Sequence, residues 1–300
     1  MKSKVFIIIG IISLLVLIGC SADESSFEQK MQGDQLTHVH GLGYTEEGRL
    51  LFGTHAGLKY YDNEQWYETN KNINDYMGFN VVDRGFYTSG HPSAQSDLPN
   101  PIGLQRSLDG GKTLESLGFV GETDFHLLAV GYSSHDIFLY NPKPNSELKS
   151  GFYISKDEGD TWKNISVVGV KGEYVDLAIH PTNSNLLAIA TTAGVYFSED
   201  GGVNFNLLTN QEQGTGLFFN EQTLIYASFN GEASLTTYKL ETKEKTVKNL
   251  PDIGEDAPKY IAQNPNNEDE YVIYTYSDDI FISKDHMESW DLISRSGSVQ

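Results

Sequence analysis

The stretch Ser155–Trp162, SKDEGDTW, decides the fold because variants of it recur along the chain. Successive copies start 48, 43 and 85 residues apart (155−107, 198−155, 283−198), so the last gap is about two periods. In the full pattern an Asp side chain accepts backbone N–H bonds, a Gly supplies a positive φ, and a closing aromatic residue anchors the next strand. The pattern therefore predicts one tight turn per repeat. The other copies are SLDGGKTL (107–114), SEDGGVNF (198–205) and SKDHMESW (283–290), and the predicted structural turn residues are Asp109, Asp157, Asp200 and Asp285.

A turn that returns every forty-odd residues is typical of a β-propeller, in which each repeat forms one blade. Six pentads can be aligned at the first strand of each repeat, and the third residue of each is apolar. The sequence predicts an all-β chain with a single β-propeller over residues 37–300, whose first strands line a central channel. Six four-stranded blades fit best, and seven remain an alternative if two repeats have been merged. The pentads are HGLGY (40–44), MGFNV (77–81), HLLAV (126–130), VDLAI (175–179), TGLFF (215–219) and KYIAQ (259–263).

The repeated turn resembles the Asp-box, or BNR, repeat of sialidase-like, sortilin-like and photosystem-assembly-factor-like β-propellers. This resemblance implies the same propeller fold and places the turns at the outer edge of the blades. We therefore expect the turn aspartates to be scaffold residues.

The amino terminus has the pattern of a secretory signal. Lys2 and Lys4 precede an apolar run of 14 residues that ends shortly before Cys20, the only cysteine of the chain. Such a run is too short to span a bilayer. It resembles the signal peptide and lipobox of bacterial lipoprotein precursors, so residues 1–19 are predicted to be removed.

Cys20 would then be the lipidated first residue, and the polar residues 20–36 would form a flexible tether. We expect the protein to lie in the cell envelope, anchored by lipid to the outer face of a bacterial membrane. The formal net charge of −20 makes nucleic acid an unfavourable partner because phosphates would be repelled. We expect a monomer.

Histidines gather in the first three repeats at matching positions. His40, Met77 and His126 begin three of the pentads. Residues two positions earlier share a face with these by strand alternation. Two further histidines end the second strands, which run antiparallel to the first strands, so all of these groups are expected at one mouth of the channel. The remaining members are His38, Asp75, Asp124 and Glu173 on the first strands, and His55 and His91 on the second strands.

Two long loops, 91–101 and 141–149, are predicted at the same rim. The histidine set has two interpretations: hydrogen-bonded polar residues that fill the channel, or a site for a metal ion or small polar ligand. Imidazole and carboxylate together suit a divalent ion such as zinc, and Met77 adds a thioether that would suit copper.

Several stretches of the first three repeats resemble bacterial envelope lipoproteins known as sialidase-like glycosyl hydrolases. These are HVHGLGY, THAGL, DYMGF, SGHP, NPIGL and DFHLL. The resemblance implies glycosidase activity, yet a sialidase needs three arginines at the mouth to bind its substrate carboxylate. None of the four arginines here, Arg49, Arg84, Arg106 and Arg295, falls in the mouth positions.

A glycosidase with two carboxylates is a separate alternative, in which Asp75, Asp124 and Glu173 are the candidate catalytic residues. A protein-binding scaffold is the third. The sequence leaves open whether the protein is an enzyme.

Overall fold

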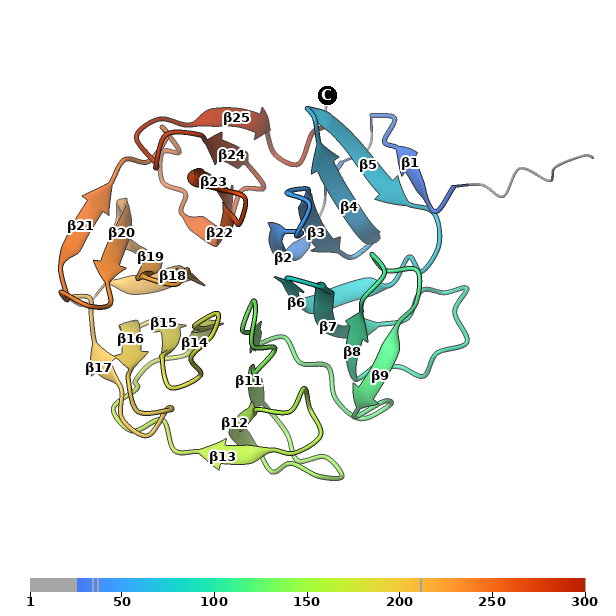
Figure 1. Ribbon diagram of the computed structural model, residues 1–300, viewed down its shortest axis with the longest axis horizontal. Helices are drawn as coiled ribbons and strands as arrows, with labels where there is room; N and C mark the ends of the chain where they lie inside the picture. Colours follow the sequence, from blue (N-terminus) through green and yellow to red (C-terminus); the bar gives the residue numbers. More distant parts are fainter. Residues whose placement is uncertain (1–25, 34, 37, 211, 300) are drawn as a thin grey trace, which may run out of the picture.

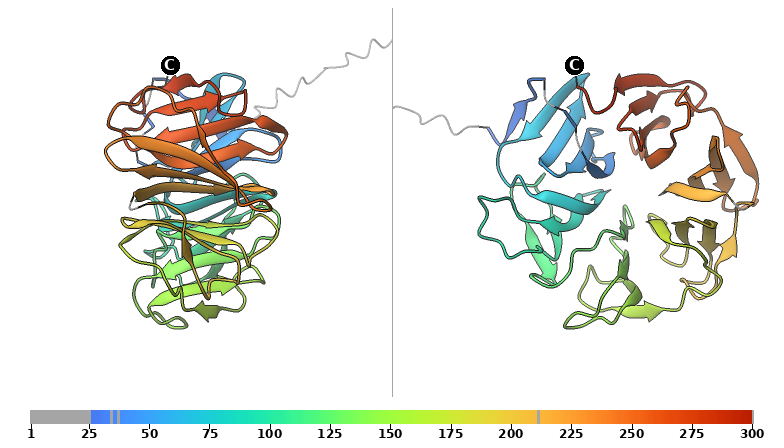
Figure 2. Two further views of the ribbon diagram at one scale, coloured as in Figure 1. Left: turned by 90° about the vertical axis from the view of Figure 1, so that its left-hand side faces the viewer. Right: turned by 180° about the vertical axis from the view of Figure 1, so that it is seen from behind.

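The computed structural model describes residues 26–33, 35–36, 38–210 and 212–299. The predicted signal peptide 1–19 and Cys20 lie outside these residues. The described chain folds into six sheets that radiate from one axis, a six-bladed β-propeller (Figure 1). Figure 2 shows the same ring from the side and from behind. The predicted fold class is confirmed with six blades, and no helix long and apolar enough to cross a membrane occurs in the described part of the chain.

Each blade is an antiparallel sheet whose four strands follow one another from the axis outward. Blade 1 contains β2 (Val39–Tyr44), β3 (Leu50–Thr54), β4 (Gly57–Asp62) and β5 (Gln65–Thr69); blade 2 contains β6 (Asp75–Val82), β7 (Gly85–His91), β8 (Leu104–Ser107) and β9 (Glu115–Gly118); blade 3 contains β10 (Leu128–Val130), β11 (Ile137–Asn141), β12 (Gly151–Ser155) and β13 (Lys163–Ile165). Blade 4 contains β14 (Tyr174–Ile179), β15 (Leu187–Thr191), β16 (Gly194–Ser198) and β17 (Asn206–Leu207); blade 5 contains β18 (Gln213–Phe219), β19 (Thr223–Phe229), β20 (Ala233–Lys239) and β21 (Lys245–Lys248); blade 6 contains β22 (Pro258–Asn264), β23 (Asn267–Thr275), β24 (Ile280–Ser283) and β25 (Asp291–Ser294).

Apolar side chains packed between neighbouring blades hold the ring together. Phe79 of β6 is buried and packs on Phe86, with 4.9 Å between ring centroids. Phe79 also approaches two glycines of blade 1: a Cβ on Gly41 would lie 2.0 Å from the Phe79 carbonyl oxygen, and one on Gly53 would lie 2.4 Å from its ring. Burying one such ring stabilises the fold by roughly 2–3 kcal/mol. The glycines of blade 1 therefore let the buried ring of blade 2 approach.

The repeated turns join the third and fourth strands at the outer edge of the blades. In the turn after β12, Asp157 accepts hydrogen bonds from the Ser155 hydroxyl at 2.8 Å and from the Thr161 N–H at 2.8 Å. The Ser155 hydroxyl also accepts the Gly159 N–H at 2.8 Å. The Thr161 hydroxyl, with the Thr161 N–H and the Ser155 hydroxyl, stabilises the carboxylate and lowers the pKa of Asp157. The same Ser–Asp contact occurs at Asp109, Asp200 and Asp285.

A short strand, β1 (Glu28–Lys30), adds a fifth strand to blade 1 by pairing with β5. It lies inside the segment 20–36 that the sequence analysis assigned to the tether, so ordered structure begins before residue 37. Its sequence, EQK, carries no apolar alternation that could predict a strand. Backbone pairing stabilises it instead, together with an ion pair between Glu28 and Arg49 at 2.7 Å.

The two ends of the described chain close the ring. The Leu36 N–H donates to the Gly297 carbonyl oxygen at 2.7 Å, and Leu36 is completely buried. Val299 is buried in the same apolar cluster, which spans blades 1 and 6. Closure of this kind could not be predicted because the contacts join short segments without a strand pattern.

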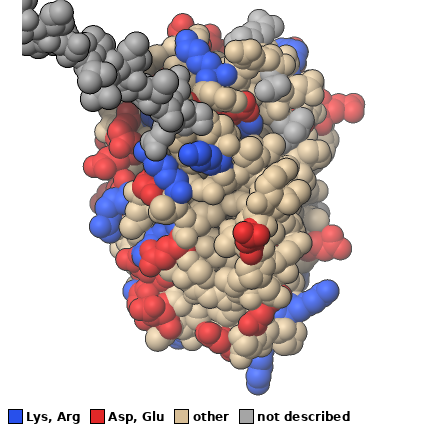
Figure 3. Space-filling view, turned by 90° about the vertical axis from the view of Figure 1, so that its right-hand side faces the viewer, with Lys and Arg blue, Asp and Glu red and all other residues tan. Residues whose placement is uncertain are grey.

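Acidic side chains are spread over the outside of the ring. On the side shown in Figure 3 they lie at several separate places, with lysines and arginines among them. On this side the negative charge therefore does not gather into one patch.

Candidate functional site

The first strands of the six blades line a central cavity of about 580 Å³. In five blades this strand carries a β-bulge near its start, where the ladder to the second strand shifts by one residue. A bulge redirects a side chain, and bulges are frequent beside functional sites. The residues that fall in these irregularities are His40, Gly78 and Phe79, Val175, Thr215 and Lys259.

Three histidines of blade 1 stack on one another at the mouth of this cavity. The ring of His55, in the turn after β3, lies between His38 and His40, with centroid distances of 4.7 and 4.6 Å. His38 has a left-handed backbone with φ of 53°. Simple strand alternation, from which the sequence analysis argued, does not hold here. The rings meet because a bulge and a left-handed residue redirect them.

Asp75, the first residue of β6, faces this stack from blade 2. Its Oδ1 lies 3.6 Å from Nε2 of His55. One ligand atom each from His40, His55 and Asp75 lies within 4.8 Å of the others, the arrangement of a candidate metal centre.

The surroundings of His40 favour its neutral form. Burial, together with the nearby His55 and Lys259, lowers the pKa of His40 to about 3, because a second positive charge would be repelled. Nε2 of His40 and Oδ1 of Asp75 are buried without a hydrogen-bond partner in the described chain. A neutral imidazole with an unpaired nitrogen is the form that binds a metal ion.

A second group of two histidines and one aspartate lies where blade 2 meets blade 3. Oδ2 of Asp124 is 3.2 Å from Nε2 of His91 and 3.1 Å from Nδ1 of His126. Nδ1 of His91 is 2.7 Å from the side-chain oxygen of Asn100, in the long loop 91–101. Burial raises the pKa of Asp124, and the two imidazoles oppose that shift. Oδ1 of Asp124 is buried and also has no partner among the described residues.

These contacts define the mouth cluster, a name we use for seven side chains from blades 1 to 3. Its members are His38, His40, His55, His91, His126, Asp75 and Asp124.

Two residues that the sequence analysis grouped with these lie apart from them. Met77 is buried within β6, opposite Ser89, and no described contact joins its sulfur to an imidazole. Glu173 is exposed beside blade 4, where its N–H donates to the Thr192 hydroxyl at 3.0 Å. The thioether argument for copper therefore has no support from contacts, and Glu173 makes no described contact with Asp75 or Asp124.

The second long loop, 141–149, packs beside the cluster. Asn145 donates to the Thr123 hydroxyl at 2.9 Å, and the Ser146 N–H donates to Glu122 at 2.7 Å. Both contacts fall next to Asp124, so the loop supports the segment that carries this carboxylate.

Sequence reasoning missed a second polar group across the channel. Asp176 of β14 accepts the N–H groups of Leu177 and Leu217, both at 2.9 Å, and its burial raises its pKa to about 7. Lys259 of β22 donates to the Val39 carbonyl oxygen at 3.4 Å, and burial lowers its pKa. Thr215 has a buried hydroxyl without a described partner. Lys259 and Thr215 stand first in their pentads, as His40 does. This shared position is the sequence signal from which the second polar group could have been predicted.

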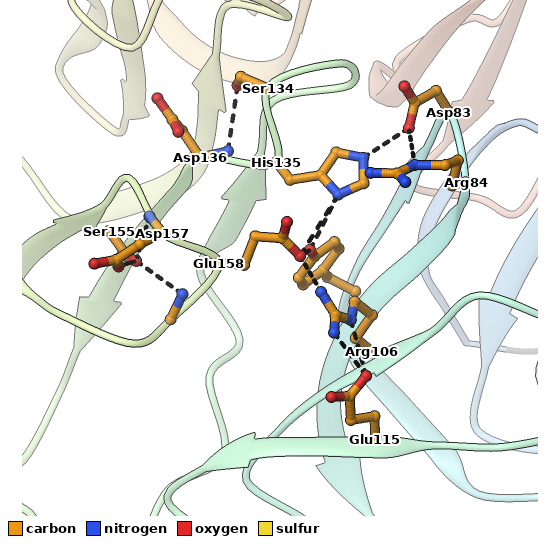
Figure 4. A network of polar contacts seen from close by, with 12 residues as sticks. Asp83, Arg84, Arg106, Glu115, Ser134, His135, Asp136, Ser155, Asp157 and Glu158 are labelled. Atoms are coloured by element: carbon orange, nitrogen blue, oxygen red, sulfur yellow. Dashed lines mark hydrogen bonds and ion pairs between the residues drawn. The ribbon is translucent and has the colours of Figure 1, made fainter.

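A separate histidine network lies at the opposite rim, where blades 2 and 3 meet (Figure 4). Nε2 of His135 is 2.6 Å from Asp83, and Nδ1 is 3.2 Å from the Tyr87 hydroxyl. Glu158 accepts from Tyr87 at 2.9 Å and pairs with Arg106. Every group here has a partner, as expected of a structural network. None of the described residues that line the cavity is an arginine.

The chain matches no protein-family model. It is 32% identical over 109 residues to a xyloglucanase from Hypocrea jecorina (strain QM6a), a match that covers 32% of this chain and 12% of that protein. Among solved structures, an ancestral GH74 enzyme aligns with 90% of this chain and 40% of its own length, at 12% identity and a TM-score of 0.54. YCF48 bound to D1 peptide aligns with 89% of this chain and 85% of its own length, at 14% identity and a TM-score of 0.53. The chain thus spans well under half of the glycosidases it resembles, and the structural likeness supports the propeller fold.

Proposed function

We propose that the protein binds a divalent transition-metal ion at the mouth of its channel, with His40, His55 and Asp75 as ligands. The observation that carries the proposal is that one ligand atom from each of these side chains lies within 4.8 Å of the others, while Nε2 of His40 and Oδ1 of Asp75 are buried without a hydrogen-bond partner among the described residues. Leaving a buried polar atom without a partner destabilises a fold by about 1–3 kcal/mol, so two at one point favour a missing ligand.

The donor set selects the class of ion. Two imidazoles and one carboxylate suit zinc, copper(II), nickel or cobalt, whereas calcium and magnesium prefer oxygen ligands throughout. Three protein ligands leave at least one coordination position open, so a small polar molecule could bind to the ion.

Metal content and zinc titration of the purified protein test this proposal. The wild-type protein should retain zinc through gel filtration, and the variants His40→Ala and His55→Ala should bind it more than 100-fold more weakly. His286→Ala is the matched control because it removes an exposed imidazole that pairs with Asp269 at 2.6 Å, away from the mouth. Unchanged zinc affinity in both mouth variants would refute the proposal.

We further propose that this site lies outside the cell, on a lipoprotein held to the membrane through Cys20. The sequence of residues 1–20 supports this placement, as does the resemblance to Asp-box envelope lipoproteins. Fractionation of cells that express the full chain tests it. The wild-type protein should sediment with membranes, and Cys20→Ser should abolish lipid labelling.

A second candidate function is glycoside hydrolysis. The partial identity to a xyloglucanase favours it, as does the presence of Asp75 and Asp124 in one cluster. Hydrolysis of aryl glycosides or xyloglucan that survives chelation and is lost in Asp124→Asn would support this candidate. A protein-binding scaffold, the third alternative, would show neither metal retention nor turnover.

A further inference from the structure

A lysine side chain lies beside the proposed metal centre without a carboxylate that balances its charge. Lys259 of β22 is partly buried, and its Nζ donates to the carbonyl oxygen of Val39, the residue before His40, at 3.4 Å. The rings of Tyr260 and Tyr276 face the same ammonium, with their centroids 5.0 and 5.8 Å from Nζ. An ammonium has three donors, so one long contact to a carbonyl oxygen leaves most of this capacity unused.

The two aspartates that attract this ammonium do not pair with it. Asp176 and Asp278 both favour the charged form of Lys259, yet among the described residues neither forms an ion pair with its Nζ. Asp176 instead accepts two backbone N–H groups, and Asp278 accepts the Tyr274 hydroxyl. A partly buried charge without a close partner is unfavourable, so this position favours an anion supplied by a ligand.

The neighbouring strand adds an unpaired hydroxyl beside this lysine. Thr215 of β18 is 3% exposed, and its Oγ1 has no hydrogen-bond partner among the described residues. Its carbonyl oxygen accepts the Tyr276 hydroxyl at 3.2 Å. A Cβ on Gly216, the next residue, would lie 2.7 Å from the Lys259 carbonyl oxygen. Thr215, Lys259 and His40 fall in the β-bulges of three consecutive blades, 5, 6 and 1, so they lie along one arc of the mouth.

The ammonium also affects the binding of an ion. A positive charge beside the centre opposes the binding of a bare dication, because like charges repel strongly in a partly buried site. An anion at the open coordination position removes this conflict, since both the ion and the ammonium attract it. Asp75 and Asp124 of the mouth cluster would repel a second negative charge, and no arginine is among the described residues that line the cavity. A carboxylate, with its single charge, therefore fits this mouth better than a phosphate does.

We propose that the mouth binds a small molecule through its carboxylate group, which ligates the ion and pairs with Lys259. This inference rests on the proposed function, since it names the class of ligand for the same ion. The Thr215 hydroxyl supplies a further donor on the same arc.

Titration of the cobalt(II)-loaded protein with acetate, at constant ionic strength, tests the proposal through the visible absorbance of the ion. Acetate should change the spectrum until the site is saturated, whereas acetamide, which has a similar shape and no charge, should not. In Lys259→Met the dissociation constant of acetate should rise by roughly tenfold or more, since a charged hydrogen bond is lost. Zinc alone should bind this variant several-fold more tightly, because the repelling charge is gone.

Three further variants support this test. Lys259→Arg keeps the positive charge and should retain acetate binding. Thr215→Val should weaken acetate binding by about fivefold and leave zinc binding unchanged, because it replaces one hydroxyl with a methyl group. Lys239→Met is the matched control, since the Lys239 ammonium is 58% exposed and pairs with Glu244 at 3.2 Å on blade 5.

The possible outcomes separate this inference from the proposed function. Intact ion binding with an unchanged acetate affinity in Lys259→Met would overturn the carboxylate site and leave the metal centre. Equal responses to acetate and acetamide in the wild type would do the same without any variant. Phosphate that binds more tightly than acetate would overturn the choice of a carboxylate. A wild-type protein that binds no ion would overturn both proposals.

Discussion

The molecule contains two networks of histidine and carboxylate at opposite rims, and they differ in whether their polar atoms have partners. At the junction of blades 2 and 3 away from the mouth, the His135 side chain is 3% exposed, and both of its nitrogens contact a polar group. At the mouth, Nε2 of His40 and one oxygen each of Asp75 and Asp124 are buried and unpaired among the described residues. Both networks combine imidazole with carboxylate.

Composition alone therefore does not distinguish a structural network from a binding site. We call a network closed when each buried polar group has a partner, and such a network lowers the free energy of the folded state. We call a network open when some buried groups have none, and it raises that free energy until a ligand supplies the missing contact.

His135→Ala should reduce the free energy of unfolding by roughly 3 kcal/mol, because it removes a buried imidazole together with its hydrogen bonds to Asp83 and Tyr87 and leaves a cavity. Zinc binding should be unchanged, since the network lies at the far rim. Urea unfolding measures the first quantity and calorimetry the second. His286→Ala is the control for removal of an imidazole. A stable variant with impaired zinc binding would reverse the assignment of the two networks.

Zinc should stabilise the wild-type protein by about 2.7 kcal/mol when its free concentration is 100 times the dissociation constant. Asp75→Asn should lose at least half of this effect, because one ligand becomes a neutral amide. Without metal, that variant should be as stable as the wild type or more stable, since a buried, unpaired carboxylate oxygen has been replaced. Thermal unfolding with and without zinc checks both statements. Marked destabilisation of the metal-free variant would mean that Asp75 belongs to a closed network.

The sequence was sufficient to predict the ring because the fold depends on short-range signals. The turn at Asp157 and the apolar third residue of each pentad, such as Phe79, are local patterns, and their period favours six blades while leaving seven as an alternative. The position of the mouth cluster at one rim of blades 1 to 3 could also be predicted, because strand ends in adjacent blades meet at the same rim.

The sequence could not supply the details that make the cluster an open network. The bulge at His40 and the left-handed backbone of His38 change which way the side chains face, and neither has a sequence signal strong enough to predict it. Burial of Asp176 depends on blade 5, because its second hydrogen bond comes from Leu217. Strand β1 was missed because its stability comes from pairing and not from its own residues.

Asp176→Asn should alter the pH dependence of stability. Burial raises the pKa of this carboxyl from 3.8 to about 7, against the attraction of Lys259 on the facing strand. A folded-state pKa above the unfolded value makes stability greatest below pH 4 and reduces it as the pH rises to 7. The variant should lack this decline. It should be less stable than the wild type at pH 4, through one lost hydrogen bond, and more stable at pH 8 by roughly 2 kcal/mol.

Urea unfolding of the wild type and of Asp176→Asn at pH 4, 6 and 8 measures that difference. Asp256→Asn is a suitable control because Asp256 lies near blade 6 and, like Asp176, accepts two backbone N–H bonds, from Ala257 and Ser277. If stability changed with pH in the same way in the wild type and in Asp176→Asn, the Asp176 carboxyl would ionise normally. The polar group across the channel would then resemble the closed network at His135.

The smallest effect is expected at the outer turns, where the carboxylates again have every partner they need. Asp109 accepts from the Ser107 hydroxyl at 2.9 Å, the Thr113 N–H at 2.9 Å and the Thr113 hydroxyl at 2.7 Å. Asp109→Ala should lower the free energy of unfolding by roughly 1 kcal/mol, because these groups are near solvent and water replaces part of what is lost. The number of bound zinc ions should not change. Asp160→Ala removes a turn carboxylate for which no described side-chain bond exists, so it should have little effect. If Asp109→Ala instead reduced zinc binding, the presence of hydrogen-bond partners would no longer distinguish the scaffold carboxylates from those of the mouth cluster.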